Sequence, residues 1–156
     1  MQKIKPCLWF DTQAMVAAEH YTSIFPDSKI LDVVRYTEAG PGEPGTVLTV
    51  TFQIAGQELM ALNGGPRFTF TEAISLSVDC QDQEELDDLW SRLGADGDEG
   101  QCGWIRDRFG LWWQLVPTAI NALLRDGEPA RTARMMTALL GMRKLDIRAL
   151  QDAYDA

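Results

Sequence analysis

The side chains that could carry out nucleophilic or metal chemistry are few in this 156-residue sequence. Its one histidine, His20, falls in a predicted helix, and its three cysteines, Cys7, Cys80 and Cys102, form no CxxC pair. A catalytic triad needs a base beside the nucleophile, whereas His20 is expected to lie away from the strand cysteines. The cysteine pattern favours reduced thiols over a disulfide framework or a structural zinc site. The sequence therefore predicts free thiols and no nucleophilic triad.

Aromatic side chains in the predicted strands are the other candidates for chemistry, in this case for binding. They are Trp9, Phe52, Phe68, Phe70, Trp104, Phe109, Trp112 and Trp113. Because strand residues alternate between faces, one of Trp112 and Trp113 should line an open face of a sheet and the other should meet a helix, the tail or a partner. An aromatic cleft with the amide of Gln114 would suit a small, partly apolar ligand, although packing in a core or a dimer interface explains the same residues.

The elements that position these residues are predicted in the order β-α-β-β-β, twice over. The first set is a strand at 4–10, a helix at 14–25 capped by Asp11 or Thr12, and strands at 30–36, 46–54 and 58–62. The second set is a strand at 73–78, a helix opened by Asp82 with Glu85 as a capping box, a segment at 95–99, and strands at 104–107 and 111–116. The repeated order predicts a duplicated module.

The two sets can be aligned with each other, although few of the aligned residues are identical. Phe10 falls on Val78, and Gly56 on Gly110 places residues 59–62 on residues 113–116. Helices predicted at 119–126, 129–140 and 146–154 follow, with an apolar face that must pack on the sheets or on a second subunit. The predicted division is a first module at 1–65, a second module at 66–117 and a helical tail at 118–156, within one compact domain.

Five strings of residues occur together in an order that resembles a known family. They are Leu8–Asp11, Tyr21–Ser28, Ala55–Gln57, Ala61–Pro66 and Cys102–Gln114. With them, about residues 3–155 resemble the PhnB-like branch of the vicinal oxygen chelate superfamily, which includes glyoxalase I, bleomycin- and fosfomycin-resistance proteins and dihydroxybiphenyl (extradiol) dioxygenases. Some members of the branch carry the label 3-demethylubiquinone-9 3-methyltransferase.

This resemblance implies an α+β fold of two βαβββ modules with curved mixed sheets, completed as a homodimer. In metalloenzymes of the superfamily, His, Glu or Gln side chains on the first and last strands of each module hold a divalent ion. The inward candidates in this sequence are Pro6 and Leu8, Met60, Ile74 and Leu76 (Ala73 and Ser75 if the register slips), and Gln114. Of the candidates, only Gln114 offers a suitable donor, so we expect neither a metal site nor another cofactor.

The methyltransferase label is not supported by the glycine pattern. A domain that binds S-adenosylmethionine normally shows a glycine-rich turn between a strand and a helix, and neither Gly40-Pro41-Gly42 nor Gly64-Gly65 lies in that context.

The sequence is thus expected to encode a glyoxalase-like protein that binds a small organic molecule without a metal. The candidate ligand-binding residues are Cys7, Trp9, Met60, Trp104, Trp113 and Gln114. One alternative is a metal-dependent lyase, transferase or dioxygenase of the superfamily that uses a divalent ion. Another is a non-catalytic, dimeric interaction protein whose aromatic residues serve packing alone.

The composition limits which partners the protein can bind and in which cellular compartment it is expected. The sequence has 14 Lys and Arg against 23 Asp and Glu, a net charge of -9, which disfavours binding to nucleic-acid phosphates. No apolar run approaches the ~20 residues of a membrane helix, and the N-terminus lacks the apolar stretch of a signal peptide. We therefore expect a cytoplasmic homodimer that binds neither nucleic acid nor membranes.

Overall fold

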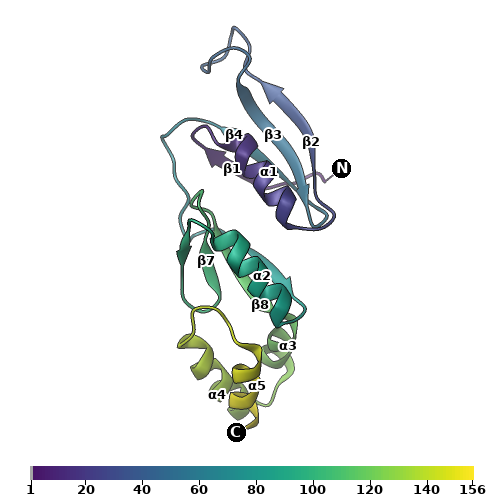
Figure 1. Ribbon diagram of the computed structural model, residues 1–156, viewed down its shortest axis with the longest axis vertical. Coiled ribbons are helices and arrows are strands. Elements are labelled where there is room, and N and C mark those ends of the chain that lie inside the picture. Colours follow the sequence, from purple (N-terminus) through teal and green to yellow (C-terminus); the bar gives the residue numbers. More distant parts are fainter. Residues whose placement is uncertain (1) are drawn as a thin grey trace. The chain divides into compact units, whose positions relative to one another are not determined.

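A computed structural model describes residues 2–156. Contacts divide the chain into two compact units, unit 1 (Met1–Phe70) and unit 2 (Thr71–Ala156), and the helical tail belongs to unit 2. Each unit contains a mixed four-stranded sheet, and the strand orders β1-β4-β3-β2 and β5-β8-β7-β6 correspond element by element. The α+β architecture with a duplicated βαβββ module, predicted from the order of elements, is confirmed (Figure 1).

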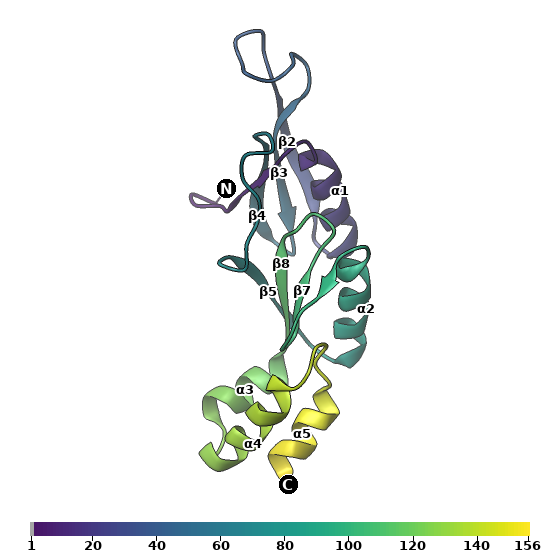
Figure 2. The same cartoon turned by 90° about the vertical axis from the view of Figure 1, so that its left-hand side faces the viewer.

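Unit 1 consists of β1 (Cys7–Phe10), α1 (Ala14–Ile24), β2 (Lys29–Arg35), β3 (Val47–Ile54) and β4 (Gln57–Asn63). Strand β1 runs parallel to β4, and the other neighbours are antiparallel. Helix α1 covers one face of the sheet, as both Figure 1 and Figure 2 show. The buried side chains of α1, among them Ala17, Ala18 and Tyr21, face the sheet. The Tyr21 ring stacks on the ring of Phe52 in β3. The opposite face of the sheet carries no helix and is called the open face of unit 1.

Two details of unit 1 differ from the sequence-based expectation. Strand β1 begins at Cys7 rather than at Ile4, whose side chain is 86% exposed. Neither Asp11 nor Thr12 caps α1, because the first helical amide, that of Ala14, donates instead to the side-chain oxygen Oδ1 of Asn63 at 2.8 Å. The cap is therefore supplied by the end of β4, 49 residues along the chain.

Unit 2 repeats the arrangement with β5 (Ser75–Cys80), α2 (Gln83–Gly94), β6 (Asp98–Glu99), β7 (Trp104–Arg106) and β8 (Trp112–Pro117). Strand β5 runs parallel to β8. Asp82 caps α2 by accepting from the amide of Glu85 at 2.9 Å. The Glu85 carboxylate accepts in return from the amide of Gln81, so the predicted capping box is confirmed with its second bond one residue earlier.

The tail of unit 2 consists of α3 (Thr118–Asp126), α4 (Pro129–Leu140) and α5 (Ile147–Asp155). Its apolar side chains form a small core of their own, with Ile120, Met135, Leu150 and Tyr154 buried. Leu145, between α4 and α5, is buried against Gly103 of the segment that leads into β7. The tail therefore packs on itself and on the rest of unit 2.

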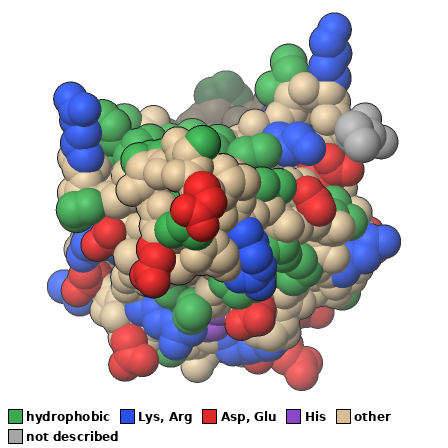
Figure 3. Space-filling view, turned by 90° about the horizontal axis from the view of Figure 1, so that it is seen from above, with side chains coloured by type: hydrophobic (Ala, Val, Ile, Leu, Met, Phe, Trp, Pro, Cys, Tyr) green, Lys and Arg blue, Asp and Glu red, His purple; other side chains and the backbone are tan. Residues whose placement is uncertain are grey.

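Two surface properties bear on the expected partners. None of the helices within residues 2–156 has the length and hydropathy needed to cross a membrane. On the face seen in Figure 3, acidic and basic side chains alternate with hydrophobic ones instead of gathering into a patch of one sign. That face offers no continuous basic surface for phosphates.

Candidate functional site

The open face of unit 2, opposite α2, brings two indoles and an amide together. Trp104 on β7 lies opposite Gln114 on β8, and Trp112 lies two residues before Gln114 on the same face. The Trp104 and Trp112 rings meet edge to face with centroids 6.3 Å apart. The Gln114 amide nitrogen donates to the Ser75 hydroxyl of β5 at 2.9 Å. Strand pairing thus assembles these four side chains, which we call the aromatic face, from three strands.

Trp113, one of the predicted ligand-binding residues, does not belong to this face. It is 1% exposed and points to the side of the sheet that α2 covers. Its indole N–H donates to the Asp107 carboxylate at 2.9 Å. The alternation of Trp112 and Trp113 was predicted correctly, but the open-face position belongs to Trp112, so placing Trp113 in the site was wrong.

Asp107 is a buried residue that the sequence reasoning missed. Its side chain is 2% exposed and accepts from the amides of Phe109 and Leu111, at 2.8 and 3.0 Å, in addition to Trp113. A carboxylate with several donors satisfies its lone pairs and fixes the turn between β7 and β8. The signal was an Asp three residues before a Gly in a turn, which marks a structural turn rather than a catalytic group.

The open face of unit 1 carries the remaining predicted residues, Cys7, Trp9 and Met60. Cys7 lies beside Met60 in the parallel pairing of β1 and β4. The Trp9 indole N–H donates to the Gly65 carbonyl at 2.9 Å, and its ring meets Phe68 with centroids 5.0 Å apart. The connector at residues 64–68 therefore covers Trp9, which serves packing in this unit.

The thiols of Cys7 and Cys80 are protonated at neutral pH. Desolvation raises the pKa of the Cys7 thiol. Burial, helped by the negative charges of Glu85 and Asp79, raises the pKa of the Cys80 thiol to about 12. Because the thiolate is the reactive species, neither side chain is poised as a nucleophile. His20 lies on α1 beside Tyr21, away from either open face, as the sequence predicted.

The residues present do not fit the divalent-metal site of the superfamily. Of the expected inward positions, Leu8 and Leu76 lie on the helix-covered sides of their sheets, whereas Met60 and Gln114 lie on the open faces. A thioether is a poor ligand for such an ion, and the single amide oxygen of Gln114 does not make a site by itself. Within the described part of the chain, no three His, Cys, Asp or Glu side chains are grouped so that they could hold a metal.

The glycines do not fit a nucleotide-type cofactor either. The turns from strand to helix, 11–13 and 81–82, contain no glycine. Gly40 and Gly42 instead pack against the Tyr36 ring, since a Cβ added at either would lie 2.8 or 2.4 Å from a ring carbon. These glycines accommodate an aromatic side chain, and nothing in their placement forms a phosphate cradle.

Unit 1 also contains a recess that the sequence did not predict. Its volume is about 720 Å³, and it lies where α1 begins, between the loop after β2 and the end of β4. Asn63 fixes this region by capping α1 and by donating to the Val47 carbonyl at 3.1 Å. Arg35 at its edge donates to the Gly45 carbonyl at 3.0 Å. None of the predicted ligand-binding residues lines it.

Comparison with known proteins identifies the family. The model of the 3-demethylubiquinone-9 3-methyltransferase family matches residues 2–116. The chain belongs to this family. A solved PhnB protein from Bacillus cereus, which carries the same methyltransferase description, is 39% identical, and the match covers 75% of this chain and 100% of that one with a TM-score of 0.69. The predicted PhnB-like membership is confirmed. The family match ends within β8, so the tail lies outside the matched residues.

More distant structures share the fold. A protein from Pseudomonas aeruginosa is 17% identical with a TM-score of 0.62, covering 75% of this chain and 98% of that one. The fosfomycin resistance protein FosX from Listeria monocytogenes, solved with manganese and sulfate, is 16% identical with a TM-score of 0.53, covering 80% and 98%. These likenesses show that the chain shares its fold with both proteins. No curated protein matches the chain.

Proposed function

We propose that this protein binds a small, planar and partly apolar organic molecule on the aromatic face of unit 2. One observation carries the proposal: Trp104 and Trp112 pack against each other beside Gln114, whose amide is oriented by Ser75. Indoles offer flat apolar surface, and edge-to-face or offset contacts with a bound ring contribute ~0.5–1.5 kcal/mol beyond area burial. An oriented amide adds one donor and one acceptor that fix the position of the ligand.

The charges near this face favour a neutral ligand. Arg106 follows Trp104 by two residues on the same face, but its guanidinium is paired with Asp98 at 2.8 Å. Asp79 at the far end of β5 accepts from Asn121 of α3 at 3.3 Å. Because the Arg106 guanidinium is already paired, it offers an anionic ligand little attraction, which favours a neutral ligand.

The proposal is that binding does not require a metal. The amide and hydroxyl groups of the aromatic face suit hydrogen bonding to an organic molecule better than coordination of a hard or borderline cation. The manganese described for FosX belongs to that protein. Elemental analysis of protein purified without chelator or affinity tag tests this: stoichiometric zinc, manganese, nickel or iron would favour the metal-dependent enzyme of the superfamily instead.

Ligand binding is tested by a metabolite screen followed by mapping of the hits. A compound at 100 times its dissociation constant should stabilise the fold by roughly 2.7 kcal/mol, which is visible as a raised melting temperature. Backbone and indole NMR shifts of the hits should map to Trp104, Trp112 and Gln114. Shifts confined to the recess beside Arg35 would place the site in unit 1 and overturn the assignment.

Two variants and one control sharpen the mapping. Trp112→Ala removes an indole of the aromatic face, and Gln114→Leu removes its amide while keeping a similar volume. Each should weaken a mapped ligand about tenfold, since 1.4 kcal/mol corresponds to a factor of ten. Phe68→Ala is the control, because it deletes a 55%-exposed aromatic ring that belongs to unit 1. A screen without any hit would favour the interaction protein whose aromatic residues only pack.

We further propose that the protein forms homodimers and resides in the cytoplasm. The free state of Cys7, Cys80 and Cys102 supports a reducing compartment. Sedimentation at micromolar concentration tests the dimer, and a monomer under those conditions would contradict it.

A further inference from the structure

The helical tail forms hydrogen bonds with the segment that precedes β7. The amide of Cys102 donates to the Met142 carbonyl at 2.8 Å, and the amide of Gly103 donates to the Arg143 carbonyl at 2.7 Å. The Gly103 carbonyl in turn accepts from Leu115 of β8 at 2.9 Å. Gly103 is thus held between the tail on one side and the sheet on the other.

These bonds support a turn that is unfavourable by itself. Cys102 has a φ of 59° and Gly103 a φ of 83°, so two successive residues adopt left-handed conformations. This conformation suits glycine but costs a residue with a Cβ about 1 kcal/mol or more. A Cβ at Gly103 would also lie 3.1 Å from the side chain of Leu145. The tail therefore stabilises the strained turn by hydrogen bonding and by contact.

The turn leads directly into the aromatic face. Trp104 follows Gly103, and its amide donates to the Gln101 carbonyl at 3.1 Å to close the turn. The direction of the chain at Gly103 sets the start of β7 and with it the position of the Trp104 indole against Trp112. A shift of the tail would consequently move one wall of the proposed ligand site.

A glutamine on α2 holds the tail in place. The Gln83 amide nitrogen donates to the Leu145 carbonyl at 3.1 Å, and its oxygen accepts from the Ile147 amide at 2.9 Å. Beside it, Lys144 pairs with Asp87 at 2.8 Å. A single side chain of the family domain thus bonds to both sides of the N-cap of α5.

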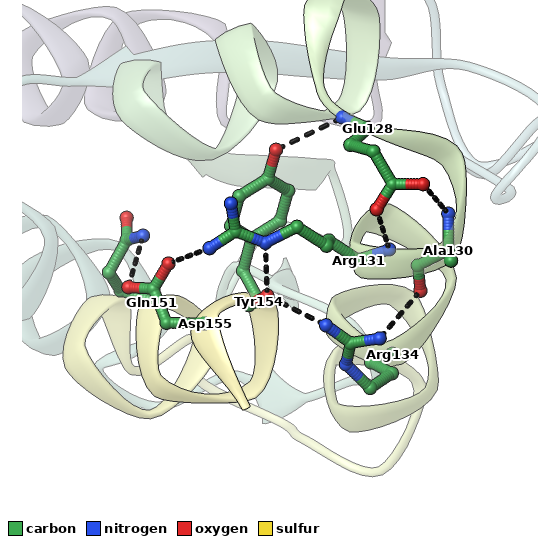
Figure 4. A network of polar contacts seen from close by, with 7 residues as sticks. All are labelled: Glu128, Ala130, Arg131, Arg134, Gln151, Tyr154 and Asp155. Atoms are coloured by element: carbon green, nitrogen blue, oxygen red, sulfur yellow. Dashed lines mark hydrogen bonds and ion pairs between the residues drawn. The ribbon is translucent and has the colours of Figure 1, made fainter.

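Helices α4 and α5 are joined by several hydrogen bonds and an ion pair (Figure 4), so a change at one end of the tail can displace the whole tail. Arg131 and Arg134 of α4 both donate to the Tyr154 carbonyl in the last turn of α5, at 3.0 and 3.2 Å. Arg131 also pairs with Asp155, and the Tyr154 hydroxyl accepts from the Glu128 amide at 3.0 Å. The two helices are bonded at the end remote from Leu145, so the pair can move as one body.

We propose that the tail is a positioning element for the aromatic face, with Gln83 and Leu145 as its positioning residues. This inference rests on the proposed function of that face, but its structural part concerns Trp104 in the free protein. The tail lies beyond the family match, which ends at residue 116. Ligand affinity at the aromatic face should then depend on residues that do not contact the ligand.

The test compares Gln83→Ala with Gln151→Ala. Gln151 is the matched control, since it is also a glutamine and bonds only to Asp155 in the next turn of α5. In ligand-free protein, Gln83→Ala should shift the indole N–H resonances of Trp104 and Trp112 and raise hydrogen exchange at Cys102 and Gly103. Gln151→Ala should leave these signals unchanged.

Affinity for a compound that maps to the aromatic face gives the second measurement. Gln83→Ala should weaken it about five- to tenfold, and Gln151→Ala should not. If no compound binds the wild-type protein, the proposed function fails, while the shift of the Trp104 resonance still supports the structural coupling. Raised exchange at Cys102 and Gly103 with an unchanged Trp104 resonance would overturn the inference.

A second variant covers the case in which Gln83→Ala does not fold. Gln83→Glu keeps an oxygen that can accept from Ile147 and removes the donor to Leu145 and Asp87, so it should shift the same indole resonances. Leu145→Ala, compared with the exposed Leu140→Ala, tests the contact with Gly103 in the same way.

Discussion

The sheets of unit 1 and unit 2 share one strand order but differ in the length of two strands and in the contacts that hold the turns beside them. In unit 1, β2 and β3 are seven and eight residues long, and β3 turns into β4 through Ala55-Gly56, with φ values of 45° and 80°. In unit 2, β6 and β7 have two and three residues. There the Asp107 carboxylate holds the turn into β8, and the tail holds the turn before β7. Where ladder hydrogen bonds are few, side-chain acceptors and an added element replace them.

The open faces of the two sheets also differ in how their tryptophans are packed. The connector at 64–68 covers Trp9 in unit 1, whereas Trp104 and Trp112 in unit 2 contact each other. The duplicated module therefore has two similar backbones whose open faces carry different aromatic contacts. Substitutions in each unit can test which contacts hold its strands and turns in place.

Removing the carboxylate of Asp107 should have the largest effect. Asp107→Ala leaves the Trp113 indole and two backbone amides without their acceptor in a buried site, which should cost about 4 kcal/mol of unfolding free energy. Urea unfolding measures this. Combining Asp107→Ala with Trp113→Phe should recover part of the loss, and strictly additive losses would show that the Trp113 bond contributes nothing.

Adding a methyl group where the connector packs on Trp9 should destabilise unit 1 by overpacking. A Cβ at Gly64 would lie 2.3 Å from Trp9 Cζ2, so Gly64→Ala must displace the indole and should cost about 2 kcal/mol. Gly141→Ala, whose added Cβ meets only an ordinary contact of 3.5 Å, is the control. Equal melting temperatures for the two variants would contradict the packing role of Trp9.

The cap supplied by Asn63 gives a smaller effect in unit 1. Asn63→Ala deletes the acceptor for Ala14 and the donor to Val47 and should lower stability by about 1.5 kcal/mol. Asn63→Asp keeps the acceptor and should lose less. Hydrogen exchange should rise first at the start of α1 in the alanine variant, and uniform exchange in both variants would argue against a local cap.

Removing the ion pair between Lys144 of the tail and Asp87 of α2 should have the smallest effect, which appears in the pH dependence of stability. Hydrogen bonds from Lys144 and Gln83 hold the pKa of Asp87 below its usual value. The carboxylate is therefore stabilised in the folded state, and its contribution is complete above the unfolded pKa of about 3.9 and lost as pH falls through the lower folded pKa. Asp87→Asn should flatten that part of the stability curve by a few tenths of a kcal/mol, because the pair is partly exposed.

Local signals in the sequence predicted most of the fold. Asp82 and Glu85 marked the start of α2, and apolar periodicity with Gly or Pro marked most other elements to within a few residues. The cap from Asn63 and the bond from Trp113 to Asp107 were not predicted, because each depends on which distant strand lies alongside. The choice between Trp112 and Trp113 was available, however: Gln114 was itself an expected inward position, and alternation along a strand puts Trp112, not Trp113, on the same face as Gln114.

The connector that covers Trp9 also determines how the protein can be observed. Of five tryptophans, Trp9 is the one in unit 1, and Trp90, Trp104, Trp112 and Trp113 belong to unit 2. Intrinsic fluorescence of the whole chain will thus report chiefly on unit 2. A variant that keeps only Trp9, with the other four replaced by phenylalanine, would emit from the junction of β1 and the connector and would follow the opening of unit 1 alone.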